Sequence, residues 1–548
     1  MQRLITPAKT YSEIYDTFRW ALPDQCNIAH QICDRHAEDP DKIALIHHVG
    51  ADIRTYTFRE IQQRANQFAN VLTGLGLNQG DRVMVLLPQH PVTAISHIAC
   101  WKAGLISVPT SILFGVDGLE YRLNNAEIRA VVTDQANLEK VLEAKKLAPS
   151  LEHIFVIDGS PEGGAMPFYE TLDRASDSFR TLMFSPDTPA LINYTSGTTG
   201  WPKGTLHGHR VLFGHLPGAE VLFDLYPQPG DKMWSPADWA WMGGLGNTLL
   251  CGWNYGTPIL VFPMAGFDPE LTMRRMGEHA IRNAFMTPTM MKLLKPHSHL
   301  VERNNVRLRS IISGSEAVGK DLLSAMLDIF KATINEGFGQ TEANMTLGNC
   351  SGLNHYRIGS LGTPLPGHKA SILDDEGNEL PPGTVGNLAF KRPDPVMLLE
   401  YWRAPEATAS KFIGDWMISG DLASKDEDGF YWFHGRADDV ITSSGYRIGP
   451  TEIEDAIIRH PAVSMAAAIG VSDPERTEII RAYVMLLPGH EPSDALADEI
   501  RQSVRDRLSK HEYPREIRFV DSFPMTTTGK ILRRELRAQA KAEQSGQG

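Results

Sequence analysis

Residues 190–215 read ALINYTSGTTGWPKGTLHGHRVLFGH and combine three patterns in one short stretch. The apolar run at 190–195 predicts a buried strand, the middle is rich in glycine and hydroxyl side chains, and residues 206–215 are expected to form a helix. A glycine-rich loop between a strand and a helix can direct backbone N–H groups at a phosphate, and Lys203 would add a positive charge. Taken alone, the same stretch could equally be a solvated surface loop.

Strand-like and helix-like segments alternate along most of the chain. Thr57 and Glu60 have capping-box spacing ahead of a helical pattern over residues 61–75, and Gly76 suits a helix C-terminus. Such alternation predicts an α/β fold with mainly parallel sheets covered by helices, which bind ligands at the carboxyl ends of their strands. The expected strands are 82–88, 105–110, 258–262, 283–288, 308–314 and 333–339.

The pattern changes after residues 429–439, GFYWFHGRADD. Shorter elements follow, and a chain of 548 residues exceeds what one compact domain usually holds. We therefore expect a large N-terminal domain over residues 1–435 and a small, mobile α+β domain over residues 436–548. In the small domain, the expected helices are 452–459 and 494–509, and the expected strands are 463–470, 479–486 and 516–520.

Charge and cysteine usage exclude several classes of protein. The net charge of −13 argues against a nucleic-acid partner, which usually requires a basic face. The five cysteines form no CxxC pair, which suits reduced thiols in the cytoplasm and gives no zinc or disulfide framework. The N-terminal residues lack the basic-then-apolar order of a signal peptide. Residues 239–267 carry no charge, but their prolines and asparagines favour a buried core and pocket lining over a membrane span.

Five further motifs follow the glycine-rich loop. They are SEA at 315–317, EGFGQTE at 336–342, WMISGD at 416–421, FHGRADD at 433–439 and FPMTTTGKILRRELR at 523–537. Together with the loop, they resemble in order and spacing the motifs of the adenylate-forming (ANL) superfamily of acyl-CoA synthetases, luciferases and peptide-synthetase adenylation domains. The resemblance covers nearly the whole chain, and the GxGQTE pattern is most similar to medium-chain acyl-CoA synthetases.

The resemblance implies a ligase reaction in two steps. A carboxylate and ATP would give acyl-AMP and pyrophosphate, and coenzyme A would then give acyl-CoA and AMP. A carboxylate with a pKa of about 4 is already ionised at neutral pH, so positioning and charge neutralisation should carry the first step. The implied catalytic residues are Lys530, which would bridge the acyl carboxylate and the α-phosphate, Thr341, and Glu342, which would hold Mg²⁺.

The nucleotide site is also implied by the resemblance. The glycine-rich loop would hold the β- and γ-phosphates, Phe338 would stack on adenine, and Asp421 and Arg436 would bind the ribose. The residues implied to bind ATP or AMP are Thr195, Ser196, Gly197, Thr198, Thr199, Gly200, Lys203, Ser315, Glu316, Ala317, Glu336, Gly337, Phe338, Gly339, Gln340, Thr341, Asp421, Arg436 and Arg447.

A domain movement should separate the two steps. Lys530 lies in the small domain and the phosphate loop in the large one, so the site would close for adenylation, and the small domain would then rotate about a hinge at Asp438. The residues implied to contact CoA are Gly115, Ser444, Gly445 and Arg505.

The acyl pocket is implied to be lined by Trp241, Met242, Gly243, Gly244 and Gly339. Acetate-specific relatives carry a bulky tryptophan at the position of Gly339, so its absence should leave a cavity, which Gly243 and Gly244 would enlarge. We therefore expect a short-branched or medium-chain fatty acid, or a small cyclic acid, rather than acetate.

Other readings stay open at this point. The chain could be a benzoate-like aryl- or cyclic-acid CoA ligase, an acetyl- or propionyl-CoA synthetase, or an enzyme that loads a carrier protein. From another class, it could be a nucleotide-binding protein without catalysis, against which Lys530, Glu342 and Asp421 argue. A catalytic lysine that is accessible is also a candidate for a lysine acetyltransferase and deacetylase, since acetylation would remove its charge.

Overall fold

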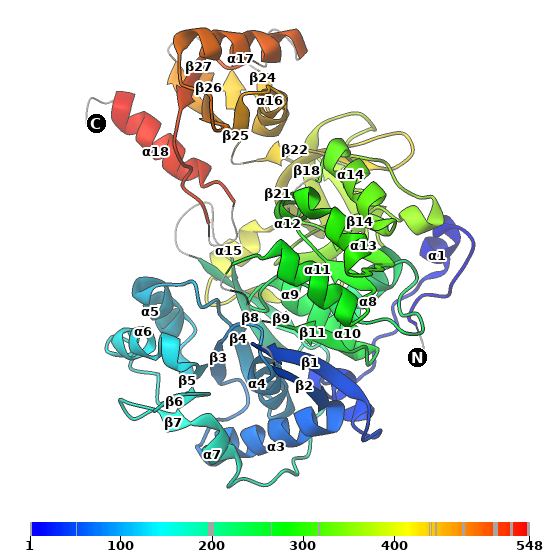
Figure 1. Ribbon diagram of the computed structural model, residues 1–548, viewed down its shortest axis with the longest axis vertical. Coiled ribbons are helices and arrows are strands. Elements are labelled where there is room, and N and C mark those ends of the chain that lie inside the picture. The colour runs from blue at the N-terminus through cyan, green and yellow to red at the C-terminus, as the bar shows by residue number, and fades with distance from the viewer. Residues whose placement is uncertain are drawn as a thin grey trace. The chain divides into compact units, whose positions relative to one another are not determined.

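The computed structural model describes residues 3–50, 52–195, 202–262, 264, 266–315, 318–437, 439, 441–443, 446–473, 477–507, 513–526 and 530–544. The chain forms two compact units, and their elements are labelled in Figure 1. The first unit contains residues up to 195, 202–370 and 391–415, and the second contains residues 371–390 and the chain from 416 onward. The boundary expected at residue 435 stays a prediction.

The first unit contains a largely parallel sheet in the order β19-β9-β8-β4-β3-β5-β6-β7. Helices α5 (Val116–Asn125) and α6 (Gln135–Lys145) pack on it through a core that includes Leu119, Leu138 and Val131. The strands are β3 (Arg82–Leu86), β4 (Ile106–Pro109), β5 (Ile128–Thr133), β6 (His153–Val156), β7 (Met166–Pro167), β8 (Pro189–Thr195), β9 (Lys203–Gly208) and β19 (Glu400–Tyr401).

The second sheet of this unit has the order β16-β15-β14-β13-β12-β10-β11-β1-β2 and is parallel from β14 to β1. Its strands are β1 (Ile43–Val49), β2 (Asp52–Thr57), β10 (Met233–Trp234), β11 (Ile259–Val261), β12 (Asn283–Phe285), β13 (Ser310–Ser313), β14 (Thr333–Gln340), β15 (Ala343–Gly348) and β16 (Thr363–Pro364). The helices packed on it are α11 (Pro269–Glu278), α12 (Pro288–Leu294), α13 (His299–Arg303) and α14 (Lys320–Phe330). The α/β class with mainly parallel sheets is therefore confirmed.

Local signals in the sequence explain where several helices begin and end. The Thr57 and Glu60 side chains form the expected capping box ahead of α3 (Phe58–Gly74), and Gly76 follows with φ +86°. Proline is the first residue of α4 (Pro91–Lys102), where its missing N–H is not needed. The remaining helices of this unit are α1 (Tyr11–Thr17), α2 (Ile28–Ile32), α7 (Phe168–Leu172), α8 (Val211–Leu222) and α15 (Pro405–Ser410).

The helix expected over residues 206–215 is wrong at its start. Residues 206–208 belong to β9, which pairs antiparallel with β8 from Thr195↔Lys203 onward, and helix α8 begins only at Val211. Strand β19 pairs with the other edge of β9, so neighbours on both sides satisfy the β9 backbone. The glycine-rich loop therefore joins the two strands of a hairpin, and no helix N-terminus follows it directly.

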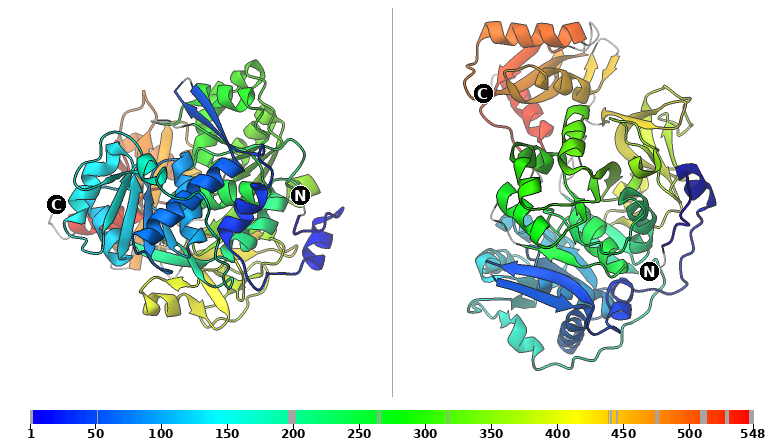
Figure 2. Two further views of the ribbon diagram at one scale, coloured as in Figure 1. Left: turned by 90° about the horizontal axis from the view of Figure 1, so that it is seen from below. Right: turned by 45° about the vertical axis from the view of Figure 1, so that its right-hand side comes forward.

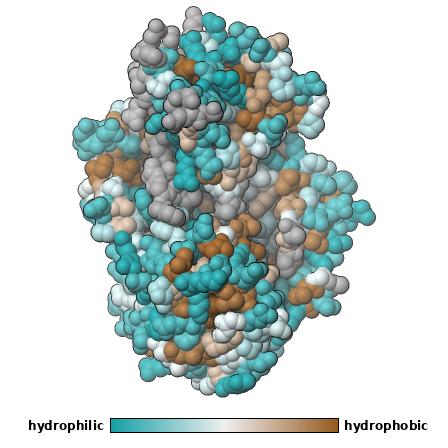
Figure 3. All heavy atoms as spheres, turned by 90° about the vertical axis from the view of Figure 1, so that its left-hand side faces the viewer, coloured by the Kyte–Doolittle hydropathy of each residue, from teal (hydrophilic) through white to brown (hydrophobic). Residues whose placement is uncertain are grey.

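Most of the uncharged stretch, over residues 239–262, is buried in the first unit. It contains α9 (Met242–Gly244), a π-helical turn (Leu245–Leu250) and α10 (Cys251–Asn254), whose residues from 244 to 254 are all buried. No helix in the described residues is both long and apolar enough to cross a membrane. On the side that carries α5 and α6, Figure 3 shows apolar side chains mixed with polar ones.

The second unit begins with a sheet that includes β17 (Ala370–Leu373), β18 (Gly386–Lys391), β21 (Trp416–Lys425) and β22 (Tyr431–Arg436), of which β21 and β22 pair antiparallel. A further sheet contains β24, β23, β26 and β25 in that order, with β27 paired to β26. These strands are β23 (Ile441–Ser443), β24 (Tyr446–Ile448), β25 (Val463–Asp473), β26 (Thr477–Leu486) and β27 (Glu516–Phe519). Their helices are α16 (Pro450–Ile458), α17 (Asp494–Arg507) and α18 (Arg533–Gln544), drawn in brown, orange and red in Figures 1 and 2. The small α+β architecture is thus as expected.

Candidate functional site

Two hairpins carry the residues expected at the phosphates and the metal. Thr195 ends β8 and Lys203 begins β9, while Thr341 and Glu342 form the turn between β14 and β15. The Thr195 hydroxyl donates to the carbonyl of Lys203 over 3.4 Å. Residues 196–200 of the glycine-rich loop lie outside the described residues.

Three contacts fix the turn at Thr341 and Glu342. The Nε2 atom of His207 lies 2.8 Å from the Thr341 carbonyl oxygen, and the backbone N–H of Leu398 donates to the Glu342 carbonyl over 2.8 Å. The Tyr401 hydroxyl donates to Oε1 of Glu342 over 2.6 Å. Because His207 lies on β9 and Tyr401 on β19, the strands beside the glycine-rich loop hold the turn of the other hairpin.

Tyr401 also contacts the lysine of the loop. The Lys203 Nζ atom lies 5.3 Å from the centroid of the Tyr401 ring, within the range of a cation–π interaction. One side chain thus joins Lys203 and Glu342, which are 139 positions apart in the sequence. The structure therefore brings together the lysine and the carboxylate that the sequence proposed for the phosphates and for Mg²⁺.

The His207 imidazole acts as a neutral donor. Burial lowers its pKa to about 4, against a smaller opposing effect of the hydrogen bond to Thr341. Because a carbonyl oxygen can only accept, Nε2 must carry the proton of the neutral ring. The side chain therefore holds the Thr341 carbonyl without adding charge beside it.

The carboxylate of Glu342 fits a magnesium ion. Its Oε1 accepts from the Tyr401 phenol, and carboxylate oxygens are the kind of ligand that Mg²⁺ prefers. The described residues also contain a cluster of His48, Glu278 and His279 whose ligand atoms lie within 4.8 Å of one another. Two of its three ligands are imidazoles, and Glu278 already pairs with Arg275 over 2.8 Å, so that cluster does not suit Mg²⁺.

The segments expected at the adenine come together at the ends of β13 and β14. Ser315 has φ +77°, a conformation that is strained for a side chain other than glycine and is common at functional sites. Oε1 of Glu336 accepts from the backbone N–H of Val318 over 3.0 Å, and burial raises the pKa of this carboxyl group. Glu336 therefore ties β14 to the chain after Ser315, while Glu316 and Ala317 lie outside the described residues.

Phe338 and its neighbours lie along β14. The Phe338 side chain is half-buried, with Leu347 as the β15 residue opposite, and Gln340 ends the strand. A Cβ atom on Gly337 would lie 3.0 Å from the Leu222 side chain, so α8 packs closely against this glycine.

The expectation that three glycines leave space in the acyl pocket is wrong for this backbone. A Cβ atom on Gly339 would lie 2.3 Å from the backbone nitrogen of Met345, so the returning strand β15 fills that position. A Cβ on Gly244 would lie 2.4 Å from the carbonyl oxygen of Asp238, and one on Gly243 would lie 2.9 Å from the Phe285 ring. These glycines permit close packing and do not open a cavity.

The aromatic residues of the expected pocket contact a second segment. The rings of Trp241 and Phe114 meet edge to face with centroids 6.2 Å apart, and the Arg122 guanidinium lies 3.7 Å from the Phe114 ring centroid. Gly115, expected at CoA, follows Phe114 and is the N-cap residue of α5. Met242 begins α9 and is buried. The structure therefore places Trp241, expected in the acyl pocket, next to the segment expected to contact CoA.

In the second unit, the two residues expected at the ribose form an ion pair. Nη1 of Arg436 on β22 lies 2.9 Å from Oδ1 of Asp421 on β21, and the two residues face each other across the strand pair. The Asp421 N–H donates to the Ser419 hydroxyl over 3.0 Å. Gly420, between them, has φ +82°, which lets the backbone approach the Arg436 guanidinium.

Lys530 exchanges two hydrogen bonds with Thr526. The Lys530 N–H donates to the Thr526 hydroxyl over 3.0 Å, and the Thr526 N–H donates to the Lys530 carbonyl over 2.7 Å. The residue is exposed. Arg505, expected at CoA, is exposed on α17, with its guanidinium 5.5 Å from the Tyr513 ring centroid. Arg447 lies on β24 with an undescribed side chain, and Asp438, Ser444 and Gly445 lie outside the described residues.

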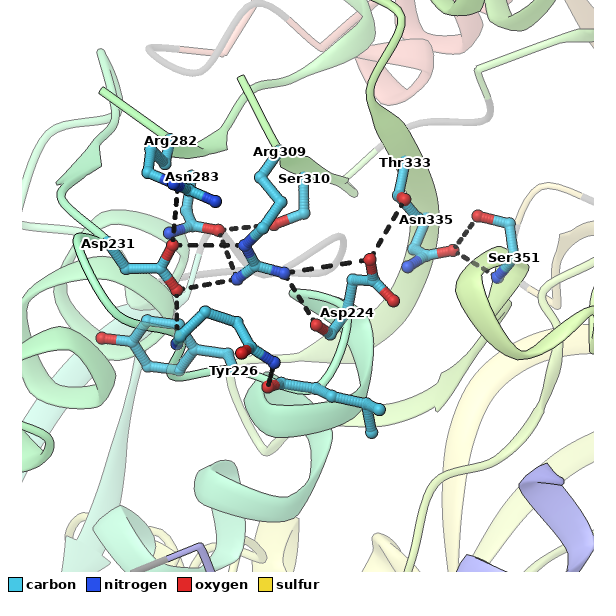
Figure 4. Close-up of polar contacts among 12 residues, drawn as sticks. Asp224, Tyr226, Asp231, Arg282, Asn283, Arg309, Ser310, Thr333, Asn335 and Ser351 are labelled. Carbon is cyan, nitrogen blue, oxygen red and sulfur yellow. Dashed lines mark hydrogen bonds and ion pairs between the residues drawn. The ribbon is translucent and has the colours of Figure 1, made fainter. Parts of the chain in front are cut away.

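A dense polar network lies at the opposite, amino ends of β12, β13 and β14 (Figure 4). Arg309 bonds Asp231 over 2.8 Å and the Asn283 amide oxygen over 2.9 Å, and its Nη1 donates to the Asp224 carbonyl over 2.7 Å. The Ser310 hydroxyl donates to Asn283 over 2.7 Å. Because the charged groups of this network pair with one another and lie at the strand ends away from the Glu342 turn, the network stabilises the sheet and is not a candidate site.

The sequence did not point to His207, Leu398 or Tyr401. All three act through contacts that join segments at least 56 positions apart, from Glu342 to Leu398. The one local signal was the apolar and aromatic stretch MLLEYW at 397–402, which resembles a short strand. Its partner strand could not be read from the sequence.

Two family models match the chain. The model described as AMP-binding enzyme matches residues 33–402, and the model of the AMP-binding enzyme C-terminal domain matches residues 452–530. An acetyl-coenzyme A synthetase of Bacillus subtilis (strain 168) is 34% identical, covering 97% of this chain and 95% of its own length. The mitochondrial acyl-coenzyme A synthetase ACSM5 of Rattus norvegicus is 33% identical, covering 94% of this chain and 91% of its own length.

Solved structures agree in fold over nearly the whole chain. The anthranilate CoA ligase AuaEII in complex with anthranoyl-AMP superimposes with a TM-score of 0.85 at 30% identity, covering 96% of this chain and 99% of that one. A benzoate CoA ligase from Burkholderia xenovorans LB400 superimposes with a TM-score of 0.81 at 29% identity, covering 93% and 100% of the two chains.

Proposed function

This chain belongs to the AMP-binding enzyme family and is an AMP-forming acyl-CoA synthetase that uses ATP, Mg²⁺ and CoA, and on that premise we propose that its acid is a short-branched or medium-chain fatty acid. The observation that supports the proposal is the absence of an indole at position 339, where this chain has glycine and acetate-specific relatives are expected to carry tryptophan. The Met345 backbone lies against Gly339, so the glycine adds no space of its own, but no indole shortens the acyl pocket from this side. The pocket's size then depends on Trp241 and the residues around Phe285.

The residues of the site have distinct proposed roles. In the first step a carboxylate oxygen attacks the α-phosphorus and pyrophosphate leaves; in the second the CoA sulfur attacks the acyl carbon and AMP leaves. We propose that Lys203 and the loop neutralise the β- and γ-phosphates, and that Thr341 contacts the α-phosphate. Glu342 would hold Mg²⁺, which would neutralise phosphate oxygens when bound. Lys530 would offset the charge that gathers where the two anions meet.

A second candidate is an aryl acid. The edge-to-face pair of Trp241 and Phe114 offers an aromatic lining, and the two superimposed structures are an anthranilate and a benzoate CoA ligase. Aromatic rings prefer such offset or edge contacts, so a benzoate-like ring would pack there as well as an alkyl chain. Acetate stays a third candidate because of the Bacillus subtilis relative.

One panel separates these candidates. CoA-dependent AMP formation is measured with acetate, propionate, isobutyrate, butyrate, hexanoate, octanoate, cyclohexanecarboxylate and benzoate, and kcat/KM is compared. We expect the maximum between butyrate or isobutyrate and octanoate. A maximum at acetate, or activity with benzoate alone, would contradict the proposed acid, and no turnover with any acid would contradict the proposed reaction.

A Lys530→Ala variant tests the role of the lysine in the same assay. Losing a positioned charge that acts in the transition state should lower acid-dependent pyrophosphate release by about 100-fold or more. The second step, measured with supplied acyl-AMP and CoA, should change little. An equal loss in both steps would show that Lys530 acts otherwise.

We also propose that Lys530 is a target of lysine acetylation and that the enzyme is cytoplasmic. The exposure of Lys530 supports the first point, and the cysteines, all buried and outside any disulfide, support the second. Mass spectrometry of protein isolated from cells, with activity measured before and after deacetylase treatment, tests acetylation. An unmodified Lys530 and unchanged activity would contradict it, and cell fractionation tests the location.

A further inference from the structure

The hydroxyl group of Tyr401 occupies a particular position in the site. Tyr401 is 5% exposed, and its hydroxyl donates to the Glu342 carboxylate over 2.6 Å. A hydrogen bond to a charged group is stronger than one between neutral groups and gives the carboxylate a fixed direction. The same residue presents its ring to Lys203 at 5.3 Å.

The backbone around Tyr401 is held rigidly. Tyr401 pairs with Thr205 of β9, and the N–H groups of Leu399 and Trp402 donate to the Leu206 and Gly204 carbonyls over 2.8 and 2.7 Å. The Tyr401 N–H donates to the Thr408 hydroxyl over 2.9 Å. The strand pairing fixes the backbone of Tyr401, and the burial of its side chain restricts rotation of the ring, so the phenol is a well-held support for Glu342.

From this geometry we propose that Tyr401 is a positioning residue for the adenylation step. Its hydroxyl orients Glu342 toward the magnesium ion, and its ring orients Lys203 toward the phosphates. The inference rests on the proposed function, because it assigns Glu342 and Lys203 to Mg²⁺ and ATP. It predicts that the Tyr401 hydroxyl affects the Mg²⁺ concentration needed for half-maximal adenylation, whereas the Tyr401 ring affects the KM for ATP.

The two contacts can be separated by two substitutions. Tyr401→Phe removes the bond to Glu342 and keeps the ring beside Lys203, whereas Tyr401→Leu removes both contacts. In Tyr401→Phe, the Mg²⁺ concentration that gives half-maximal pyrophosphate release should rise about tenfold, in line with the loss of one hydrogen bond to a charged group. The KM for ATP should stay within about twofold in Tyr401→Phe and should rise in Tyr401→Leu.

A matched control removes a tyrosine hydroxyl elsewhere. Tyr226 is fully buried, and its hydroxyl donates to Thr257 at a distance from the Glu342 turn. Tyr226→Phe should therefore keep the Mg²⁺ dependence of the unsubstituted enzyme, even where it lowers thermal stability. The second step, AMP release from supplied acyl-AMP and CoA, should stay within about twofold in Tyr401→Phe, because Glu342 and the pyrophosphate take no part in it.

A double-substitution cycle shows whether Tyr401 acts through Glu342. In a Glu342→Gln background the further change Tyr401→Phe should have no effect on the residual adenylation rate, because the group that the hydroxyl orients is gone. An unchanged Mg²⁺ dependence in Tyr401→Phe, an equal loss in both steps, or full additivity in the cycle would each overturn the proposal. If none of the acids in the panel causes the unsubstituted enzyme to release pyrophosphate, the proposed function itself is wrong, and the inference fails with it.

Discussion

A glycine residue of this site borders either open space or a closely packed neighbour, and the sequence does not show which. At Gly339 the absence of a side chain suggested space, but the Met345 backbone fills that space. Met345 itself has φ +54°, which shows how tightly β15 turns against β14 at this point. A missing side chain can thus indicate either a cavity or a close approach, and only the positions of distant atoms distinguish the two.

Gly339→Ala adds one methyl group and tests whether residue 339 borders a cavity or a closely packed backbone. Because the new Cβ would meet backbone and not a flexible side chain, the Thr341–Glu342 turn must shift. We expect adenylation to fall by about tenfold or more with every acid of the panel, since a small misplacement of positioning groups has a large effect on rate.

The pattern across acids is the informative measurement. A change in kcat/KM that is uniform from acetate to octanoate would support displacement of the turn. A selective loss of the longer acids, with acetate preserved, would instead show that residue 339 borders open space in the acyl pocket.

The sequence predicted individual site residues better than their supports. Lys203, Thr341 and Glu342 belong to short motifs, whose residue types and spacing are visible without a structure. His207 lies on β9, and Tyr401 is placed beside it by the pairing of β9 with β19, which joins segments about 200 positions apart. Motifs are local, whereas the contacts that orient them are not, so the sequence could indicate the chemistry but not its geometry.

At the level of elements, contacts between distant segments also explain why the helix expected over residues 206–215 begins later than predicted. The apolar residues around 206–215 fit a helix, yet residues 206–208 are the last part of strand β9, which pairs with β8 on one edge and, at Thr205 and Leu206, with β19 on the other. Tertiary pairing overrides a local pattern where a strand has partners on both sides. Helix α3, by contrast, has a capping box and a long apolar period of its own, and it forms where the sequence predicted it.

The network at the amino ends of β12 to β14 should contribute strongly to stability. Asp231 is buried and depends on Arg309, so Arg309→Met would leave a buried charge without its closest partner. We expect the free energy of unfolding to fall by about 3 kcal/mol or more. Arg392→Met is a matched control, because the Arg392 pair with Asp415 is largely exposed and should contribute less than about 1 kcal/mol. Urea unfolding measures both; equal effects would contradict a structural role for the network.

A buried carboxyl group ties the N-terminal segment to α8. Glu220 accepts hydrogen bonds from the N–H groups of Leu4 and Ile5 over 2.6 and 2.8 Å and from the Tyr255 hydroxyl, and burial raises its pKa to about 7. A raised pKa means that the folded state holds the proton more tightly than the unfolded state. This contribution to stability is therefore complete below about pH 4.5 and is lost as the pH rises toward 7.

Glu220→Gln isolates that pH dependence. Glutamine cannot ionise, so the variant should gain thermal stability relative to the unsubstituted protein as the pH rises from about 5 to 7.5. Any offset from the altered hydrogen bonds should be the same at every pH. Melting temperatures of both proteins across this range measure the effect, and parallel curves would contradict it.

For the whole molecule, the sequence and the compact units give different boundaries between the parts that unfold cooperatively. The sequence places the boundary at residue 435, whereas the compact units assign residues 371–390 and 416–435 to the second unit. In the described residues, the cores of the last sheet draw on residues from Ile441 to Ala540, and neither core contains a residue of β17, β18, β21 or β22. Segments that share a buried core unfold together, so the separate cores favour a domain boundary at residue 435.

Two substitutions that create cavities of similar size can distinguish between these two boundaries. Ile480→Ala in β26 and Leu388→Ala in β18 each remove a fully buried aliphatic side chain and should cost about 2–5 kcal/mol. Ile480→Ala should lower one calorimetric transition by several degrees and so identify the C-terminal part. We expect Leu388→Ala to leave that transition unchanged and to lower another, because its side chain belongs to neither C-terminal core. If both substitutions lower the same transition, residues 371–435 unfold with the C-terminal sheet, and the cooperative C-terminal part is larger than the sequence motifs indicate.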